Sequence, residues 1–431
     1  MIKSALVPRT YQPDAAAHYE NSFIVHWPEM IDADTCEWLV GDGGRAWLAR
    51  AAELTGTAVQ RAARLRRELS AERTAAVLGQ LELRERARAK FLAADRLFFQ
   101  AVPLEQATDQ AIAEYKARRF DRFDRVSDLC CGIGGDLMSL ATKSQTIGLD
   151  RDPAVTVFAQ ANLNALGRPG QVATMDFTPE AVAADAWHID PDRRPAGRRT
   201  THLEIHEPRP DLIEQLFARH PHGAIKLAPA TDLPLAWSTA AEREWISRAG
   251  ECKQQVVWFG DLSQGAGQVR ATLLARALDT PADRAVLATV AGPPSMELPH
   301  AAAIGRYVLE PDAAVLAADL AGHLAKQHSL AAITPGIAYL TGDYAVADPA
   351  LACFEVLESM PYRPARLAAW LKERHIGRLE IKKRGVTEDP AKVRKLLRVD
   401  GDNAATILLL PVARSVTAII ARRTAARDEQ P

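Results

Sequence analysis

Residues 128–136 read DLCCGIGGD, and the pair Leu149-Asp150 follows about one βα unit later. The apolar start of this stretch predicts a β-strand, and its glycines predict a sharp turn at which a ligand can approach the backbone closely. We expect a helix from near Leu137. Strand, glycine-rich turn and helix form the opening unit of an open α/β sheet, in which ligands bind outside the carboxyl ends of the strands. The stretch therefore predicts a Rossmann-like fold with its ligand site at this turn.

The spacing of the glycines separates two classes of ligand. Dinucleotide-binding sheets carry the pattern G-x-G-x-x-G, whose helix N-terminus meets a pyrophosphate. Counted from Gly132, the third glycine position is Leu137, so this pattern fails. The flanking acids Asp128 and Asp136 disfavour a pyrophosphate and suit a sulfonium and an amino group. We therefore expect S-adenosylmethionine as the cofactor, and the missing glycine counts against an NAD-dependent oxidoreductase.

Two later strand ends complete the expected cofactor site. Asp150 ends the second strand, where an acid can accept hydrogen bonds from both ribose hydroxyls. Asp176 can accept from the adenine amino group, while Phe177 covers the ring. A lone Asp after a strand is more often a helix cap, but three signals in order at this spacing predict one site. The expected cofactor-binding residues are Asp128, Gly132, Gly134, Gly135, Asp136, Asp150, Asp176 and Phe177.

The fourth strand ends in Asp190-Pro191-Asp192-Arg193. In the same fold, amino-methylating enzymes carry Asn/Asp-Pro-Pro-aromatic at this place, where the Asx side chain and a proline carbonyl accept hydrogen bonds from an NH₂ group. Asp190 and Pro191 keep the first half of that pattern and are the expected catalytic residues. Asp192 and Arg193 replace the second proline and the aromatic residue, although a guanidinium also stacks on a base. Lys226, at the end of the fifth strand, faces the same cleft or is a core lysine.

Basic residues gather in three segments, although the net charge of the chain is only −1. Arg61 to Arg96 holds ten Lys/Arg against five Asp/Glu, and Pro361 to Asp400 holds twelve against five. Such faces can meet phosphates, and the alternative is a solvated helix face. The loop after the fourth strand adds four expected phosphate-binding residues, for which surface ion pairs are the alternative: Arg193, Arg194, Arg198 and Arg199.

Apolar periodicity divides the 431 residues into three parts. Residues 1–123 are predicted to be mainly helical after an extended start at Ser22–Trp27, and a long helix is expected within Ala75–Arg96. Residues 124–300 alternate strands and helices, and prolines near residue 300 mark a linker. Residues 301–431 predict an α+β domain with helices at Ala313–His328 and Pro364–His375 and strands at Gly377–Ile381, Ala405–Leu410 and Val416–Ala421. The seven strands expected in the middle part are Val126–Cys131, Thr146–Asp150, Val172–Met175, Ala186–Ile189, Gly223–Leu227, Gln255–Phe259 and Ala285–Val290.

Several classes of protein are disfavoured by composition. No apolar run is long enough to cross a membrane, and the start of the chain lacks the pattern of a signal peptide. None of the five cysteines forms a CxxC pair, so neither a disulfide framework nor a metal site is expected. These features predict a cytoplasmic protein without metal or membrane partner.

Several segments together resemble a known family. DLCCGIGGD, GLDRDP, IDPDRRPAGRR, PGIAYLTGD and GRLEIKKRG resemble bacterial class I S-adenosylmethionine-dependent methyltransferases with a THUMP-like C-terminal domain. The resemblance covers most of the chain; DLCCGIGGD alone also resembles trimethylguanosine synthase-type cap methyltransferases. It implies a C-terminal domain related to THUMP domains, which bind structured RNA, especially tRNA. Lys382, Lys383 and Arg384 then form an expected phosphate-binding turn. Gln106 and Thr108 are expected over the cofactor, with a helix cap as the alternative.

The leading hypothesis is therefore an RNA methyltransferase acting on a base nitrogen of tRNA or rRNA. The alternatives are a methyltransferase for a protein or small molecule, and a non-catalytic RNA-binding protein with a degenerate methyltransferase fold. The near-intact cofactor signals disfavour the last alternative, and the altered Asp190–Arg193 segment keeps it open.

Overall fold

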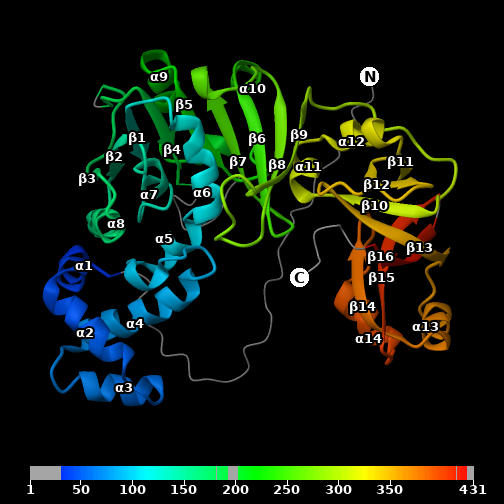
Figure 1. The fold of residues 1–431 in the computed structure, drawn as a ribbon, viewed down its shortest axis with the longest axis horizontal. Helices are drawn as coiled ribbons and strands as arrows, with labels where there is room; N and C mark the ends of the chain where they lie inside the picture. Colours follow the sequence, from blue (N-terminus) through cyan, green and yellow to red (C-terminus); the bar gives the residue numbers. More distant parts are fainter. Residues whose placement is uncertain (1–30, 181, 193–201, 414, 425–431) are drawn as a thin grey trace.

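The computed structural model describes residues 31–180, 182–192, 202–413 and 415–424. It consists of a helical N-terminal module, a large central sheet with its helices and a C-terminal domain with a second sheet (Figure 1). The expected extended start and the arginines of the 193–199 loop lie outside the described residues.

The central sheet has nine strands in the order β3-β2-β1-β4-β5-β7-β6-β8-β9. Strands β1 to β5 pair with one another in parallel, while β7 is antiparallel to β5 and β6. The order reverses between β1 and β4, the place where ligands bind in open α/β sheets. The strands are β1 Arg125–Leu129, β2 Gln145–Asp150, β3 Gly170–Thr174, β4 Ala186–Ile189, β5 Gly223–Leu227, β6 Glu242–Arg248, β7 Glu251–Phe259, β8 Val269–Leu274 and β9 Val286–Gly292.

The Rossmann-like fold class is confirmed, but the expected number of seven strands is wrong, because β6 and β8 escaped sequence reasoning. Strand β6 carries Glu242 and Glu244, which an apolar pattern excludes from a core strand. Both are buried against cations: Arg119 Nη1 lies 2.7 Å from Glu242 Oε2, and Arg119 Nη2 lies 3.0 Å from Glu244 Oε2. Arg270 of β8 adds a contact of 2.7 Å to Glu242. Ion pairing thus lets charged residues occupy a sheet interior.

The helical module packs on the edge of this sheet and shares its core. The ring centroids of Phe98 and Phe158 of α8 lie 5.6 Å apart, and α1 packs against α8. The expected helix within Ala75–Arg96 is split into α4 and the short η1. The helices of the module and sheet are α1 Ala33–Val40, α2 Asp42–Ala52, α3 Ala58–Leu65, α4 Ala71–Ala87, η1 Ala94–Arg96, α5 Ala101–Gln106, α6 Gln110–Ala117, η2 Arg118–Phe120, α7 Leu137–Leu140, α8 Pro153–Leu166, η3 Leu203–Ile205, α9 Pro210–Arg219, α10 Leu235–Ala240 and η4 Gly260–Leu262.

The C-terminal domain holds a seven-stranded sheet in the order β11-β12-β10-β13-β16-β15-β14. Four strands, β10 to β13, were not expected, and the expected helix Ala313–His328 is two helices, because Asp319 between them has φ +55°. Its elements are β10 Tyr307–Pro311, α11 Ala313–Ala317, α12 Ala321–His328, β11 Ala331–Thr334, β12 Ile337–Gly342, β13 Leu351–Pro361, α13 Pro364–Glu373, β14 Ile376–Lys383, α14 Pro390–Leu397, β15 Asn403–Val412 and β16 Ser415–Arg423.

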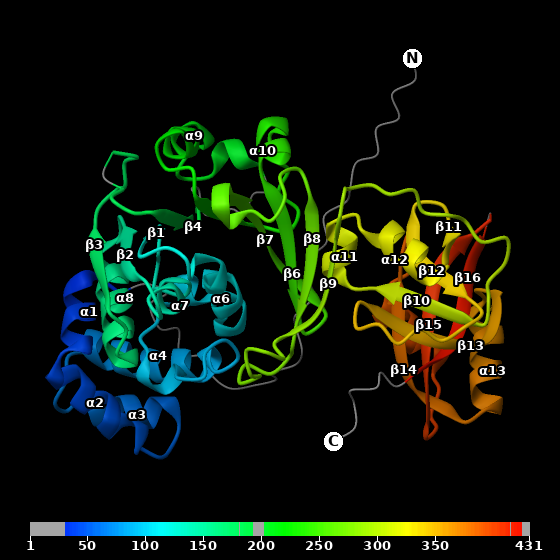
Figure 2. The same cartoon turned by 45° about the horizontal axis from the view of Figure 1, so that its top comes forward.

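Helix α11 joins the two sheets. It contacts β6, β7 and β8, and a common apolar cluster includes Trp245 and Leu273 of the central sheet with Val315 and Leu324 of the C-terminal domain. Figure 2 shows α11 and α12 between the central sheet and the second sheet. In the part of the chain that the structure describes, no helix is long and apolar enough to span a membrane, and no cluster of three potential metal ligands occurs.

Candidate active site

The glycine-rich turn follows β1 directly and is shaped by its backbone. Gly132 has φ +53°, in the left-handed region that favours glycine, and a Cβ built there meets no atom within 4 Å. At Gly135 a Cβ would lie 3.3 Å from the Thr108 backbone, so the missing side chain allows that segment to approach. Helix α7 has a single turn, so its dipole contributes little. The open space beside Gly132 is a place where a ligand can pass close to the backbone.

Asp150 lies at the carboxyl end of β2, beside this turn. Its Oδ2 accepts a hydrogen bond from the Gly132 amide (2.9 Å), and its Oδ1 accepts from the Asp152 amide (3.0 Å). Burial raises the pKa of Asp150, and these two N–H donors oppose that rise. A carboxylate has about four acceptor positions, so each oxygen keeps one for a further donor. The carboxylate therefore fits two hydroxyls of a ribose.

Asp128 and Asp136 belong to a buried polar network across the same turn. Asp128 Oδ1 lies 2.7 Å from His188 Nδ1, and Lys116 Nζ lies 3.2 Å from His188 Nε2. Lys116 Nζ also lies 2.7 Å from Asp136 Oδ1, while Thr108 donates to Asp136 Oδ2 (2.6 Å). Burial by itself would raise the pKa of Asp136, but the nearby cations outweigh it and hold this pKa well below its usual value. The network fixes Asp136 as a carboxylate.

The residues at or just after the ends of β1, β2 and β3 fit S-adenosylmethionine. Asp128 is among the residues around the cavity, and its buried Oδ2 has no hydrogen-bond partner among the described residues, so this oxygen has acceptor capacity for an amino group. Asp176 is exposed just beyond β3, and Phe177 is buried at the cavity edge. Gly134 closes the turn by donating to the Cys131 carbonyl (2.9 Å). The cofactor roles of these residues stay predictions.

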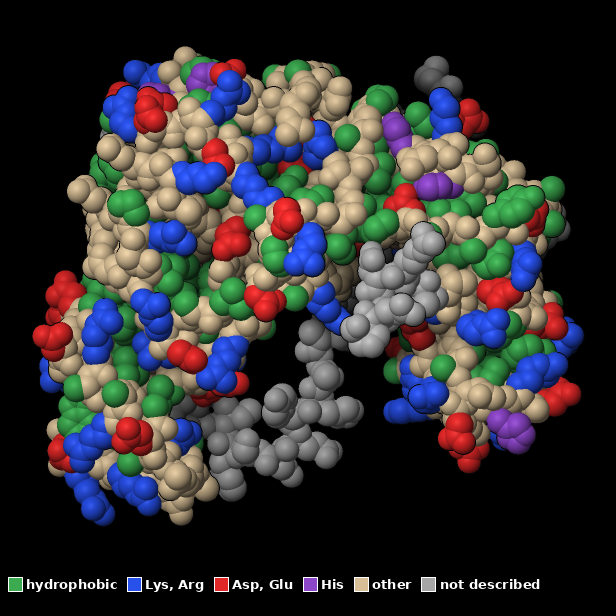
Figure 3. Space-filling view, in the orientation of Figure 1, with side chains coloured by type: hydrophobic (Ala, Val, Ile, Leu, Met, Phe, Trp, Pro, Cys, Tyr) green, Lys and Arg blue, Asp and Glu red, His purple; other side chains and the backbone are tan. Residues whose placement is uncertain are grey.

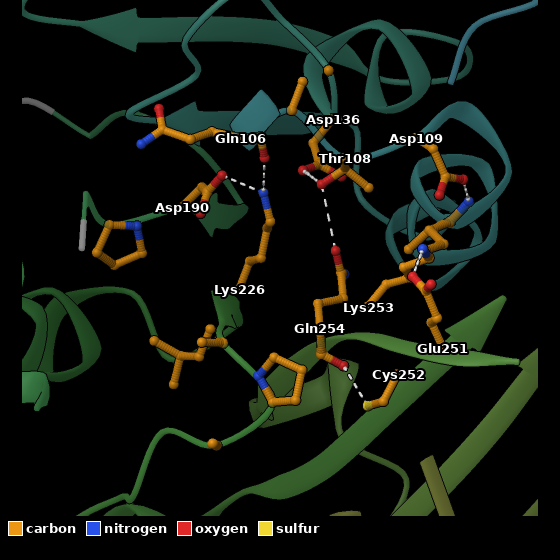
Figure 4. Close-up of a pocket in the computed structure, with 18 of the residues that line it drawn as sticks. Gln106, Thr108, Asp109, Asp136, Asp190, Lys226, Glu251, Cys252, Lys253 and Gln254 are labelled. Carbon is orange, nitrogen blue, oxygen red and sulfur yellow. Dashed lines mark hydrogen bonds and ion pairs between the residues drawn. The ribbon is translucent and has the colours of Figure 1, made fainter. Parts of the chain in front are cut away.

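The expected acceptor end of the cavity centres on Asp190, after β4. Figure 4 shows Lys226 of β5 between Asp190 and Gln106. Lys226 Nζ lies 2.5 Å from Asp190 Oδ2 and donates to the Gln106 carbonyl (2.9 Å). Lys226 therefore faces the cleft. It also ties Asp190 to the segment over the glycine turn.

A second lysine holds the same segment. Lys90 Nζ donates to the carbonyls of Leu104 (2.8 Å), Glu105 (2.9 Å) and Ala107 (2.8 Å), which are the free carbonyls at the end of α5. Burial lowers the pKa of Lys90 to about 8. Lys90 and Lys226 together engage four successive carbonyls, so the path from Leu104 to Thr108 is fixed beside the cavity.

Pro191 and Asp192 continue from Asp190 along the cavity wall. Pro191 is buried, and the Asp192 backbone pairs with Glu207 through hydrogen bonds of 2.7 and 3.0 Å. Glu207 also lies 2.6 Å from Arg151, which follows β2. The loop after β4 is thereby connected to the end of β2, next to Asp150.

The expected phosphate-binding turn lies on the opposite wall, and two of its cations are engaged within the protein. Lys382 Nζ lies 2.7 Å from Glu310 Oε2, and Arg384 Nη2 lies 3.1 Å from Glu310 Oε1. Lys383 is exposed. The phosphate-binding role of the turn stays a prediction, and Lys383 is the member best placed for it.

These walls enclose one cavity of about 2910 Å³. It is lined by the glycine turn, Asp150, Asp190 and Lys226 on one side, and by Glu310, Tyr339 and residues 382–384 on the other. Drug-sized ligands occupy cavities of about 300–1,000 Å³, so the space exceeds that of a cofactor alone. Figure 3 shows a gap below the central sheet, between the helical module and the C-terminal domain.

The order of the parallel strands, the glycine turn and the carboxylates at the strand ends define a Rossmann-like methyltransferase. Comparisons with known proteins agree. The chain is 30% identical over 331 residues to a protein named as an S-adenosylmethionine-dependent methyltransferase in two strains of Mycobacterium tuberculosis, covering 74% of this chain and 87% of the relative. The chain belongs to this family of S-adenosylmethionine-dependent methyltransferases, and S-adenosylmethionine is its cofactor.

Further comparisons cover the individual parts and the fold. Residues 351–423 match the THUMP domain-like family, and residues 32–87 match a domain of unknown function. A crystal structure of a protein from Porphyromonas gingivalis W83, assigned as a methyltransferase, has a TM-score of 0.72 and 21% identity. It covers 92% of this chain and 100% of its own, which shows that the whole arrangement of parts recurs.

Sequence reasoning missed several residues that shape the site. Asn162 of α8 is buried, accepts from the Phe98 amide (2.7 Å) and donates to the Ile133 carbonyl (3.0 Å), so it ties the helical module to the glycine turn. His188, Lys116 and Lys90 were also missed. His188 lies on β4, two residues before Asp190. A polar side chain inside this apolar strand was the sequence signal that could have indicated its role.

Proposed function

We propose that the protein methylates a nitrogen of a nucleobase in structured RNA, tRNA or rRNA, with Asp190 and Pro191 as the residues that orient the accepting nitrogen. The observation that carries this proposal is the exposure of Asp190 in the cavity. Its side chain is 32% exposed, against 2% for Asp128 and 8% for Asp136. Of these three carboxylates, Asp190 is the one that a second substrate can reach.

The chemistry required at Asp190 is mainly alignment. Bound S-adenosylmethionine supplies a methyl group on an already activated sulfonium. Asp190 would accept a hydrogen bond from the amino group of a base, which orients the nitrogen lone pair away from the carboxylate. Lys226 restrains the carboxylate through its Oδ2, so Oδ1 is left for the substrate. An exocyclic amino group fits this arrangement.

Two features support RNA as the substrate: the size of the cavity, and the cavity wall that the C-terminal domain forms. The cavity extends well beyond the expected cofactor residues and reaches Lys383 in the THUMP-like domain. THUMP domains, which this domain resembles, are associated with structured RNA. A base presented by a folded RNA would enter the cavity while the remaining RNA stays outside.

The test is transfer of tritium from labelled cofactor to total RNA of a strain lacking the protein, followed by nucleoside mass spectrometry. We expect label in a single modified base with the methyl group on nitrogen, and at least about 100-fold less label with the Asp190→Ala variant. Label in protein or in the small-molecule fraction, with RNA unlabelled, would show that the acceptor is not RNA.

A further inference from the structure

Arginines crowd one end of the helical module. Residues 61–67 carry four arginines and no acid: Arg61, Arg64, Arg66 and Arg67. The first two lie on α3, three residues apart and hence on one face, and the other two lie in the turn that leads to α4. Arg64, Arg66 and Arg67 are exposed, whereas Arg61 is partly buried. These four residues are called the arginine cluster below.

Three other exposed arginines of the module have acidic partners, while Arg45 and Arg96 donate to backbone carbonyls and Arg73 lies over the Trp38 ring. Arg50 lies 2.6 Å from Glu68, Arg88 lies 2.7 Å from Glu85, and Arg86 lies 3.7 Å from Glu105. By contrast, no acidic side chain among the described residues forms an ion pair with Arg64, Arg66 or Arg67. Glu68 is adjacent in sequence, but Arg50 engages both of its carboxylate oxygens. The arginine cluster therefore presents uncompensated positive charge.

The chemistry of the arginine cluster fits phosphates on a polymer. Guanidinium groups bind phosphate in a bidentate manner, and several together release counterions from a nucleic acid. A membrane surface would also need apolar side chains that insert, but Leu65 is buried and α3 exposes Val59 as its one large apolar side chain. RNA is therefore the favoured partner.

The position of the arginine cluster supports the same partner. In Figure 1 the helical module and the C-terminal domain extend on either side below the central sheet, with α3 at the far end of one and α14 at the far end of the other. Helix α14 and its end expose Lys392, Lys395 and Arg398. The cavity that holds Asp190 lies between these two parts. An RNA that delivers a base to Asp190 can thus touch both.

We propose that the arginine cluster is a phosphate-binding surface that grips structured RNA on the side of the cavity opposite to the THUMP-like domain. The inference rests on the proposed function for the choice of RNA as ligand. It adds a binding site in a module whose sequence relatives share a domain of unknown function.

The experiment compares two triple variants with equal loss of charge. One variant combines Arg64→Ala, Arg66→Ala and Arg67→Ala; the control combines Arg50→Ala, Arg86→Ala and Arg88→Ala, which removes paired arginines from the same module. Binding of the full-length proteins to unfractionated bacterial tRNA is measured by fluorescence anisotropy over a range of salt concentrations. Calorimetry with S-adenosylmethionine verifies that each variant is folded.

The cluster variant is expected to bind tRNA about tenfold or more weakly at low salt, with the slope of log K against log salt reduced by about two to three. The control is expected to stay within about twofold of the wild type. Equal weakening in both variants, or none in the cluster variant, overturns the inference, as does binding of the wild type to anionic vesicles but not to tRNA. If tritium is not transferred to RNA but the cluster variant alone loses tRNA affinity, the proposed methylation of RNA is contradicted. The arginine cluster is then still supported as an RNA-binding surface.

Discussion

The cofactor half and the acceptor half of the cavity place carboxylates at the same level of one sheet but surround them differently. Asp150, after β2, accepts hydrogen bonds from two backbone N–H groups, that of Asp152 in its own turn and that of Gly132 in the turn after β1. Asp190, after β4, forms an ion pair with Lys226 of the next strand, β5, and that lysine also donates to the Gln106 carbonyl. Asp150 is therefore held by backbone groups of two neighbouring βα turns, whereas Asp190 is held by a lysine side chain that also binds a distant segment. This difference predicts which substitutions affect binding, chemistry or stability.

The largest effect is expected where the cofactor half is tied to the buried network. Asp136→Asn removes the charge that compensates the fully buried Lys116, so the free energy of unfolding should fall by about 3–5 kcal/mol near neutral pH. Asp185→Asn, which breaks an exposed pair with Arg125, is the control and should cost at most about 1 kcal/mol. Urea denaturation measures both. Similar values for the two variants would mean that the network does not stabilise the fold.

The same variant has a defined pH dependence. The pKa of Asp136 is lowered in the folded state, so its contribution is complete above the unfolded value of 3.8 and is lost as pH falls below it. The stability difference between wild type and Asp136→Asn should therefore be constant from neutral pH to about pH 5 and narrow below about pH 4. A difference that grows toward acid would contradict this assignment.

The next effect concerns the acceptor half. Asp190→Ala should reduce methyl transfer about 100-fold or more, while calorimetry finds cofactor affinity within about twofold of the wild type. Asp190→Asn keeps a carbonyl oxygen as hydrogen-bond acceptor and should retain more activity than the alanine variant. If both variants are as active as the wild type, Asp190 does not orient the substrate.

A smaller effect is expected at the carboxylate that backbone groups hold. Asp150→Ala should weaken S-adenosylmethionine binding about tenfold, equivalent to about 1.4 kcal/mol, because two hydroxyl partners are lost. Saturating cofactor should restore most of the rate, in contrast to Asp190→Ala. A rate that stays low at saturating S-adenosylmethionine would mean that Asp150 contributes to the chemical step and not only to cofactor binding.

The smallest effect is expected on the opposite wall. Replacing Lys382, Lys383 and Arg384 by Ala removes three charges, but two of them already neutralise Glu310. The slope of log K against log salt for tRNA should therefore fall by only about one, compared with two to three for the arginine cluster. A loss near three would show that RNA displaces Glu310 from its lysine and arginine.

The sequence was most informative where a function depends on neighbours in the chain. The glycine turn, the strand ends and the class of fold were predictable, because glycines and carboxylates at βα spacing seldom occur together outside a ligand site of an open α/β sheet. Strand β6 was not, since Glu242 and Glu244 look solvent-exposed until Arg119, more than a hundred positions away, is placed against them. Lys226 and Lys90 likewise acquire their roles only through carbonyls that the fold brings to them.

The shared core of the helical module and α8 also determines how the molecule responds to being cut. Asn162 and the contact between Phe98 and Phe158 bind the module to the glycine turn and to α8, so we expect the module and the central sheet to unfold as one cooperative unit. A fragment starting at β1 would expose the apolar face of α8 and lose the segment held by Lys90. The two parts should therefore melt together, and the amides of the glycine turn should exchange with solvent only as fast as those of α1.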